Sequence, residues 1–229
     1  MKIIKIQTVD TVPSTSTALK KNRDQLESGL LLRAIKQTEG YGRNGKIWHT
    51  EQDKNLTFSF YLKEREKMPY QLLMATTLSL IKTLKKYHIN ASIKLPNDII
   101  VNNKKIAGIL IEVSHLNDKA SVIVGVGLNV NETNPETHNV NATSMIQTTK
   151  NPIDQNQVLE YFIQYFNTLV NSSALFQLFY KSLRLNQDTV LFESNQYCFK
   201  DINPQFECTI YNQEEIIKVP CESIKFIYN

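Results

Sequence analysis

Glycine is scarce in this chain, with only seven among 229 residues, and tryptophan occurs once. Cysteine is scarce as well: there are three, no two of them form a C-x-x-C pair, and all lie in the last quarter of the chain. An odd number of cysteines without metal-site spacing argues against a disulfide framework and against a zinc site. We expect these thiols to be reduced and buried in strands, at Cys198, Cys208 and Cys221.

Long apolar runs and a strong charge of one sign are also missing. No apolar stretch approaches the roughly 18 residues that a membrane-spanning helix needs. The first ten residues, MKIIKIQTVD, lack the apolar core and the cleavage site of a signal peptide. The net charge is only +4, which is too weak to indicate nucleic-acid binding. We therefore expect a cytoplasmic protein that binds neither membrane nor DNA.

The spacing of apolar residues predicts helices and strands that alternate over most of the chain. Strands are expected at residues 3–9, 30–36, 55–62, 92–95, 98–101, 104–113 and 120–130. Helices are expected at residues 14–27, 69–88 and 153–170, and Ser14 or Ser16 is the expected N-cap of the first. Hairpin turns are expected at 101–105 and 115–119, and a polar loop at 131–152.

The pattern changes near residue 188, where helices stop and short strands follow one another. These strands are expected at residues 189–193, 196–201, 206–212, 214–220 and 223–229. Several short strands in a small region are typical of a β-barrel-like domain. We therefore expect two domains, 1–184 and 185–229.

Three of the seven glycines fall in one short segment, EGYGRNGKIW, at residues 39–48. Gly40, Gly42 and Gly45 permit positive φ angles and a close approach of the backbone to a ligand. Successive backbone N–H groups in such a loop can bind an anion, and Arg43 adds a guanidinium that holds phosphate or carboxylate bidentately. The alternative is a flexible surface loop with solvated charges, and the segment alone does not decide between them.

Three further glycines lie inside predicted strands, at Gly108, Gly125 and Gly127. Glycine weakens a strand interior and often marks a place where a ligand approaches the backbone. Bulges or tight helix packing explain one such glycine more easily than three in adjacent strands. A Pro-Asn-Asp segment alone is more often an ordinary turn. Beside two glycine-bearing strands and Lys105, its Asn97 and Asp98 are candidates for holding polar ligand groups or a magnesium ion.

The segments EGYGRNGKIW, KLPNDI, KKIAGILIE and VGVGLNVN, in this order and at these separations, resemble the catalytic domain of the biotin–protein ligases. That family's motifs read G-R-G-R-x-G-x-x-W, K-W-P-N-D, K-x-A-G-I-L-x-E and G-x-G-x-N, and an upstream S-T-N is matched by residues 14–16. The resemblance spans residues 14–131. It implies an α/β (α+β) fold, with a mixed β-sheet packed against helices and a small C-terminal SH3-like β domain.

The resemblance also implies a reaction in two steps. Biotin and ATP, with Mg²⁺, form biotinyl-5′-AMP and pyrophosphate, and the adenylate then acylates one lysine of a biotin carboxyl carrier protein. The nucleophile of the second step belongs to the carrier, so this chain needs none of its own. Members of the family are monomers or dimers, and an exposed strand could pair with the carrier or with a second copy, so a homodimer stays open.

Roles for individual residues follow from the same resemblance. Lys105 is expected to meet the biotin carboxylate and then the adenylate linkage, and Arg43 to stabilise phosphate; these two are the expected catalytic residues. The implied biotin-binding residues are Ser14, Thr15, Ser16, Gln37, Gly40, Tyr41, Gly42, Arg43, Lys105, Gly108, Gly125 and Gly127. The implied nucleotide-binding residues are Arg43, Trp48, Lys94, Asn97 and Asn129, and Asp98 is the candidate Mg²⁺ ligand.

Three departures from the family pattern bear on the substrate. Tyr41 stands in place of the first arginine of the glycine motif, Leu95 in place of the tryptophan before Pro-Asn-Asp, and Ser16 in place of an asparagine. These changes leave open a shifted acyl specificity.

Two alternative functions remain. A lipoate–protein ligase or octanoyltransferase shares the architecture, although the octanoyltransferase nucleophile is a cysteine and the cysteines here lie outside the first domain. A non-catalytic biotin-binding sensor is the other alternative. Some family members carry an N-terminal helix-turn-helix domain, and since the first expected strand begins almost at residue 1, we expect no sequence-specific DNA binding.

Overall fold

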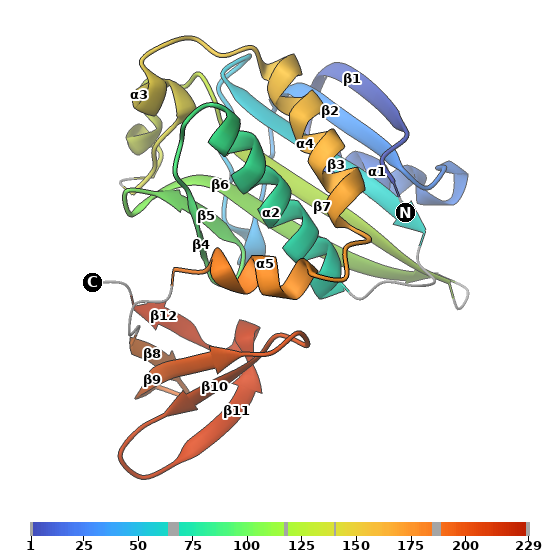
Figure 1. The fold of residues 1–229 in the computed structure, drawn as a ribbon. Coiled ribbons are helices and arrows are strands. Elements are labelled where there is room, and N and C mark those ends of the chain that lie inside the picture. Colours follow the sequence, from blue (N-terminus) through green and yellow to red (C-terminus); the bar gives the residue numbers. More distant parts are fainter. Residues whose placement is uncertain (1, 64–68, 117–118, 140, 185–188, 228–229) are drawn as a thin grey trace.

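A computed structural model of the chain describes residues 2–63, 69–116, 119–139, 141–184 and 189–227 (Figure 1). Its strands form two sheets, one with the order β1-β2-β3-β7-β6-β5-β4 and one with the order β11-β10-β9-β8-β12. The first sheet contains β1 (Lys5–Val12), β2 (Leu30–Gln37), β3 (Asn55–Lys63), β4 (Ser92–Lys94), β5 (Asp98–Val101), β6 (Lys104–Leu116) and β7 (Lys119–Asn129). The helices are α1 (Thr15–Asn22), α2 (Pro69–Lys86), α3 (Met145–Thr149), α4 (Gln155–Leu169) and α5 (Leu175–Lys181).

The seven-stranded sheet is mixed, as expected. Its first two strands, β1 and β2, run parallel, and the crossover between them contains α1. The remaining neighbours in the sheet are antiparallel. Short hairpins connect several of them, and Asn102 and Asn103 adopt φ angles of 49° and 64° at the β5–β6 turn. Two successive residues with positive φ are typical of a two-residue hairpin, so the turn predicted at 101–105 is confirmed.

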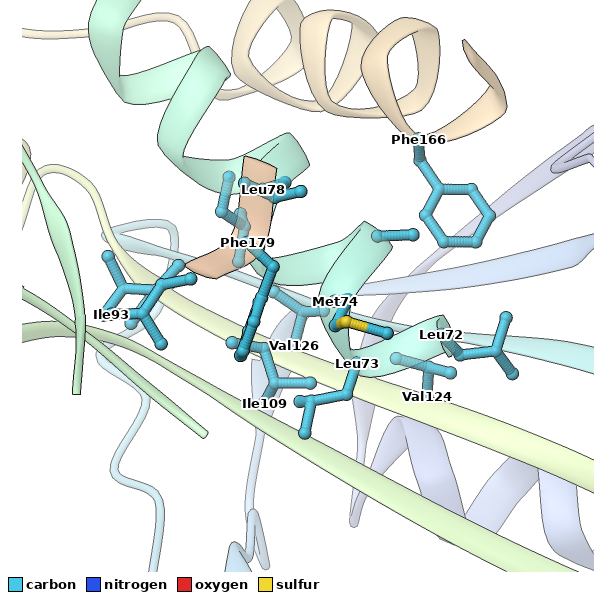
Figure 2. Close-up of a cluster of buried hydrophobic side chains, with 14 of the residues drawn as sticks. Leu72, Leu73, Met74, Leu78, Ile93, Ile109, Val124, Val126, Phe166 and Phe179 are labelled. Atoms are coloured by element: carbon cyan, nitrogen blue, oxygen red, sulfur yellow. The ribbon is translucent and has the colours of Figure 1, made fainter. Parts of the chain in front are cut away.

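One face of the sheet carries the main hydrophobic core. Leu56, Phe58, Phe60 and Leu62 alternate along β3 and are fully buried, because successive side chains of a strand point to opposite faces. The ring of Phe58 lies 4.9 Å from that of Phe162 on α4. In Figure 1, α2 and α4 cover this face, and Figure 2 shows their apolar side chains packed onto the strands.

The opposite face of the same strands carries small residues at its centre. In the register of β3 and β7, Thr57 pairs with Gly127, Ser59 with Gly125 and Tyr61 with Ile123. Residues paired in this way share a face. At one end, Tyr61 and Ile123 form a small apolar cluster with Leu19 of α1 and with two leucines of β2. The glycines lie beyond that cluster, and they leave room for the side chains of Ser16 and Trp48.

Helix α1 begins as the sequence predicts but ends earlier. Ser14 is its N-cap, and the side chain of Ser14 accepts a hydrogen bond from the backbone N–H of Thr17. The basic residues Lys20 and Lys21 occupy the last turn, where they interact favourably with the helix dipole. A 3-10 turn at Arg23–Gln25 follows, where continued helix was expected.

Three short helical segments between residues 131 and 184 were missed by the sequence prediction. Helix α3 and a 3-10 helix (Pro135–Thr137) lie within 131–152, where a loop was expected, and α5 was not predicted at all. Ser144 caps α3 by accepting from the N–H of Gln147, and Met145 packs into the core. A helix of five residues is too short to show a periodic apolar pattern. The second predicted turn, at 115–119, includes residues outside the described part of the chain.

The C-terminal residues form the expected run of strands. They are β8 (Thr189–Phe192), β9 (Asn195–Ile202), β10 (Glu207–Tyr211), β11 (Ile216–Pro220) and β12 (Lys225–Ile227), all antiparallel. Phe206 stacks on Tyr70 of α2 at 4.8 Å and packs against Phe179 of α5 at 5.3 Å. One core therefore runs through both sheets. The division at 184 and 185 stays a proposal.

The cysteine prediction is only partly right. Cys208 is buried in β10, as expected. Cys198 lies in β9 but is exposed, and Cys221 is buried in a 3-10 helix instead of a strand. All three are free thiols. No helix in the described part of the chain is long and apolar enough to cross a membrane.

Candidate active site on the glycine face

A hollow lies on the glycine-bearing face of the large sheet, between α1, the glycine-rich loop and strands β3, β5, β6 and β7. It brings together all the predicted biotin-binding residues except Gly40. Gly40 is not among its lining residues, and a Cβ atom there would stand 2.6 Å from the carbonyl oxygen of Trp48. Glycine is therefore required at residue 40 by the close approach of two loop segments.

The floor of the hollow is made of glycines for a steric reason that lies within the chain. A Cβ atom on Gly127 would stand 2.5 Å from Cζ2 of Trp48, and one on Gly125 would stand 2.9 Å from Oγ of Ser16. Gly108 pairs directly with Gly127 across β6 and β7, and its Cβ would stand 3.1 Å from Nζ of Lys105. The three glycines thus make room for the side chains that line the hollow.

One end of the hollow is lined by neutral hydrogen-bonding groups. Gln37 Oε1 accepts from the backbone N–H of Thr15 at 2.8 Å and from its hydroxyl at 3.0 Å. The hydroxyl of Ser59 lies 2.7 Å from that of Thr15 and 2.9 Å from that of Ser16. Hydroxyls both donate and accept, so this end suits a neutral ligand group that also does both.

Ser59 was missed by sequence reasoning. It is fully buried between Phe58 and Phe60 on β3, opposite Gly125. A buried serine between two phenylalanines breaks the apolar character of the strand on one face. That signal becomes specific only when the register pairs Ser59 with a glycine, and register is not readable from the segment alone.

The other end of the hollow is charged. Lys105 Nζ lies 2.6 Å from Oδ1 of Asp98 and 5.6 Å from the centre of the Trp48 ring. Arg43 Nη1 donates to Oδ1 of Asn97 at 3.4 Å. Asn97 is fixed in turn, because its Nδ2 donates to the carbonyl of Ile109 at 2.7 Å. The two predicted catalytic cations therefore face one space, and Asn97 holds the loop arginine there.

The predicted Mg²⁺ ligand Asp98 is the ion-pair partner of Lys105. Among the described residues, no group of three or more His, Cys, Asp or Glu side chains is placed to hold a metal ion. Mg²⁺ usually binds one or two protein carboxylates together with substrate phosphates. A single carboxylate beside a polyanion site fits that manner of binding, so Mg²⁺ at Asp98 remains a prediction.

The glycine-rich loop is fixed to the sheet through Tyr41, one of the three residues that depart from the family pattern. The hydroxyl of Tyr41 donates to the Glu112 carboxylate at 3.2 Å and accepts from Lys20 Nζ at 3.2 Å. Lys20 and Glu112 also form an ion pair. Burial lowers the pKa of Lys20, but the bonds to Glu112 and Tyr41 outweigh it and raise the pKa above its usual value. Sequence reasoning identified neither Lys20 nor Glu112.

The expectation of positive φ angles in this loop holds in part. Gly45 has a φ of 70°, whereas the left-handed residue before it is Asn44, with a φ of 55°. Gly42 has an extended backbone, with a φ of −117°. The loop closes through a hydrogen bond from the N–H of Gly42 to the carbonyl of Lys46 at 2.7 Å.

The predicted nucleotide-binding residues do not all share this hollow. Arg43, Trp48 and Asn97 line it. Asn129 lines a second hollow together with Trp48 and Lys105, and its Nδ2 donates to the carbonyl of Thr143 at 3.0 Å. Lys94 lines a third hollow, which also includes Asp98 and Lys105. Lys105 thus borders all three.

Comparison with known proteins agrees with this geometry. Residues 8–129, more than half of the chain, match the biotin/lipoate A/B protein ligase family. The bifunctional ligase/repressor BirA of Bacillus subtilis is 33% identical over 165 residues, which are 69% of this chain and 51% of that protein. The human biotin–protein ligase is 30% identical over 118 residues, 48% of this chain and 16% of that protein. The chain thus spans about half the length of the BirA protein.

Solved structures extend the similarity to the whole fold. The biotin protein ligase of Aquifex aeolicus, solved in complex with biotin and ATP, is 27% identical to this chain. The superposition covers 98% of this chain and 99% of that one, with a TM-score of 0.84. The expected fold, a mixed sheet with packed helices followed by a small β unit, is therefore confirmed.

Proposed function

Because the chain belongs to the biotin/lipoate A/B protein ligase family, we propose that it is a biotin–protein ligase. It would activate biotin with ATP to biotinyl-5′-AMP and transfer the biotinyl group to one lysine of a biotin carboxyl carrier protein. The observation that carries this proposal is a single hollow with neutral hydroxyls at one end and two cations at the other. The related Aquifex aeolicus protein was solved with biotin and ATP, which supports the same ligands here.

The neutral end of the hollow suits the ureido ring of biotin. A cyclic urea presents one carbonyl acceptor and two N–H donors, and the hydroxyls of Thr15, Ser16 and Ser59 can answer both kinds of group. The glycine strip beside them has no side chains, so the apolar second ring can lie close to the sheet. The indole of Trp48 would pack on the remaining side.

The charged end of the hollow suits the first chemical step. An oxygen of the biotin carboxylate attacks the α-phosphorus of ATP, and the bond from that phosphorus to the bridging oxygen breaks as pyrophosphate leaves. Both reactants are anions, so fixed positive charge is needed to bring them together. Lys105 would hold the carboxylate and Arg43 the α-phosphate. Mg²⁺, when bound at Asp98, would offset phosphate charge.

The second step uses the amine of the carrier lysine as the nucleophile. It attacks the carbonyl carbon of the mixed anhydride, an amide bond forms, and AMP leaves. The glycine-rich loop would shield the anhydride from water until the carrier arrives. The carrier as acceptor, a possible homodimer, a cytoplasmic location and the absence of DNA binding remain predictions.

A lipoate or octanoate ligase is disfavoured by the same neutral end. The dithiolane ring of lipoate and the methyl end of octanoate lack strong hydrogen-bonding groups. Seating either against Thr15, Ser16 and Ser59 would leave the remaining hydrogen-bonding capacity of these hydroxyls without ligand partners. A non-catalytic sensor is disfavoured because biotin binding alone needs no phosphate-facing arginine such as Arg43.

Intact mass spectrometry of a carrier domain tests the proposal. The purified biotin carrier domain is incubated with the protein and MgATP, with biotin, lipoate or octanoate in separate tubes. We expect a mass gain with biotin alone, and loss of that gain in Arg43→Ala and in Lys105→Ala. No gain with biotin contradicts the proposal. A gain with lipoate or octanoate, repeated on a lipoyl domain, favours the alternative ligase.

A further inference from the structure

The third hollow lies next to the candidate active site and is not used by the steps described above. It is bordered by residues of β4, β5 and β6, by Asn139 and Asn141, and by Arg184 and Phe226. Its polar lining includes Lys94, Asp98, Lys105, Asn141 and Arg184. We propose that this hollow binds the β- and γ-phosphates of ATP and holds pyrophosphate as it leaves, with Arg184 as a phosphate-binding residue. This inference rests on the proposed function.

The strand register places the hollow in line with the glycine strip. Lys94 pairs with Asp98 across β4 and β5, and Asp98 pairs with Gly108 across β5 and β6. Gly108 in turn pairs with Gly127. Paired residues share a face, so these four form a row across the same face of the sheet. The row leads from the floor of the candidate active site directly into the third hollow.

Arg184 continues that row beyond the edge of the sheet. Ile93 and Leu183 form a parallel bridge, and the backbone N–H of Arg184 donates to the carbonyl of Ile93 at 2.9 Å. The next residue on each segment points to the opposite face from the bridged pair. Lys94 and Arg184 are therefore neighbours on the face that carries Asp98.

The charges in this hollow favour a polyanion. Lys94, Lys105 and Arg184 contribute three positive charges, and Asp98 is the single carboxylate among the described residues that line the hollow. Arginine binds phosphate oxygens bidentately, which a lysine cannot do. The side-chain amides of Asn103, Asn139 and Asn141 supply further N–H donors. A diphosphate carries two phosphoryl groups and matches this mixture of charges and donors.

The direction of the reaction also points to this hollow. Lys105 borders three hollows: the hydroxyl-lined one, the second one with Asn129, and this one. The acyl group occupies the first in the proposed function, and the second, which is lined by the expected nucleotide-binding residues Trp48 and Asn129, suits the nucleoside. Pyrophosphate departs from the α-phosphorus opposite the attacking carboxylate and keeps the electron pair of the broken bond. Of the three hollows that the described residues line beside Lys105, the third is the polar one left for pyrophosphate.

Exchange of labelled pyrophosphate into ATP tests this assignment. The full chain is compared with Arg184→Met, with Arg184→Lys and with the control Lys218→Met, which removes an exposed charge on β11. We expect Arg184→Met to raise KM for pyrophosphate and for ATP about tenfold or more, with KM for biotin within about twofold. Transfer from added purified biotinyl-5′-AMP to the carrier should be unchanged. Arg184→Lys should fall between, and the control should match the wild type.

Three results would overturn the inference. One is an unchanged KM for pyrophosphate in Arg184→Met, and another is an equal rise in the Lys218→Met control. The third is an equal loss of transfer from purified biotinyl-5′-AMP, because that reaction involves no pyrophosphate. A wild-type chain without biotin-dependent exchange refutes the proposed function instead. In that case, calorimetric titration with pyrophosphate alone measures the affinity of the wild type and of Arg184→Met for pyrophosphate. Equal affinities refute the phosphate site.

Discussion

The indole of Trp48 lies so close to Gly127 that a Cβ atom on the glycine would stand 2.5 Å from the ring. The loop that carries Trp48 and the strand that carries Gly127 are therefore fitted to each other. The ammonium group of Lys105 lies over the same indole ring, with its Nζ 5.6 Å from the ring centre. The aromatic ring thus couples the glycine strip to the charged end of the candidate active site.

Replacing Gly127 with alanine is expected to displace the indole. Since Trp48 is the sole tryptophan, its fluorescence reports the change directly, and we expect a red shift as the ring moves toward water. Adenylate formation should fall about tenfold or more, because the ring no longer packs against the ligand. Thermal melting should stay cooperative. An unchanged emission maximum with unchanged activity would show that the contact does not position Trp48.

Removing the hydroxyl of Ser59 is expected to weaken biotin binding without unfolding the protein. Ser59→Ala deprives Thr15 and Ser16 of a hydroxyl neighbour, and each neutral hydrogen bond contributes about 1 kcal/mol. We expect KM for biotin to rise about fivefold to tenfold, with KM for ATP unchanged. Ser79→Ala is the matched control, since Ser79 is equally buried but bonds within α2. Equal effects of the two variants would contradict a direct role for Ser59.

Replacing Tyr41 with phenylalanine is expected to loosen the glycine-rich loop. The variant loses the bonds to Glu112 and Lys20, and a hydrogen bond to a charged group contributes about 1.5 to 3 kcal/mol. Trypsin cleavage after Arg43 or Lys46 should therefore be faster by about tenfold. Tyr211→Phe, at an exposed tyrosine of β10, should cleave like the wild type. Equal cleavage of Tyr41→Phe and wild type would show that the hydroxyl does not hold the loop.

The same cluster predicts a pH dependence of stability. The folded pKa of Lys20 is raised, so its charge stabilises the fold fully below its ordinary pKa of 10.5, and this stabilisation is lost as the pH rises through the folded value. Lys20→Met should melt below the wild type at pH 8, and the gap should narrow above pH 10.5. Melting curves at the two pH values measure it. A gap that is constant with pH would indicate lost packing instead of lost charge.

The three thiols are expected to differ in reactivity. Hydrogen bonding to Cys221, together with burial, raises the pKa of Cys208, and the thiolate is the reactive form. Cys221 is buried, whereas Cys198 is exposed. A thiol reagent such as DTNB at pH 8 should therefore modify one thiol per folded chain, and none in Cys198→Ser. Rapid labelling of more than one thiol in the folded protein would contradict this arrangement.

The sequence predicted the glycine-rich loop and the strand glycines as parts of one site. A glycine weakens the interior of a strand, so several of them in adjacent strands indicate a place where a ligand approaches the backbone. Sequence reasoning missed Ser59, Glu112, Lys20 and Arg184. Their partners are far away in the sequence and are brought close by strand pairing or by the packing of separate elements. Such pairings depend on the fold and leave no local pattern. The short helices α3 and α5 were missed for a related reason, since tertiary packing stabilises them more than their own sequence does.

Strand β7 performs two tasks on alternate residues. Val122, Val124, Val126 and Leu128 fill the core, while Gly125 and Gly127 lie on the other face. Inserting one residue in this strand would turn bulky side chains onto the floor of the ligand site and glycines into the core. The length of β7 is therefore fixed by the core and by the ligand site together.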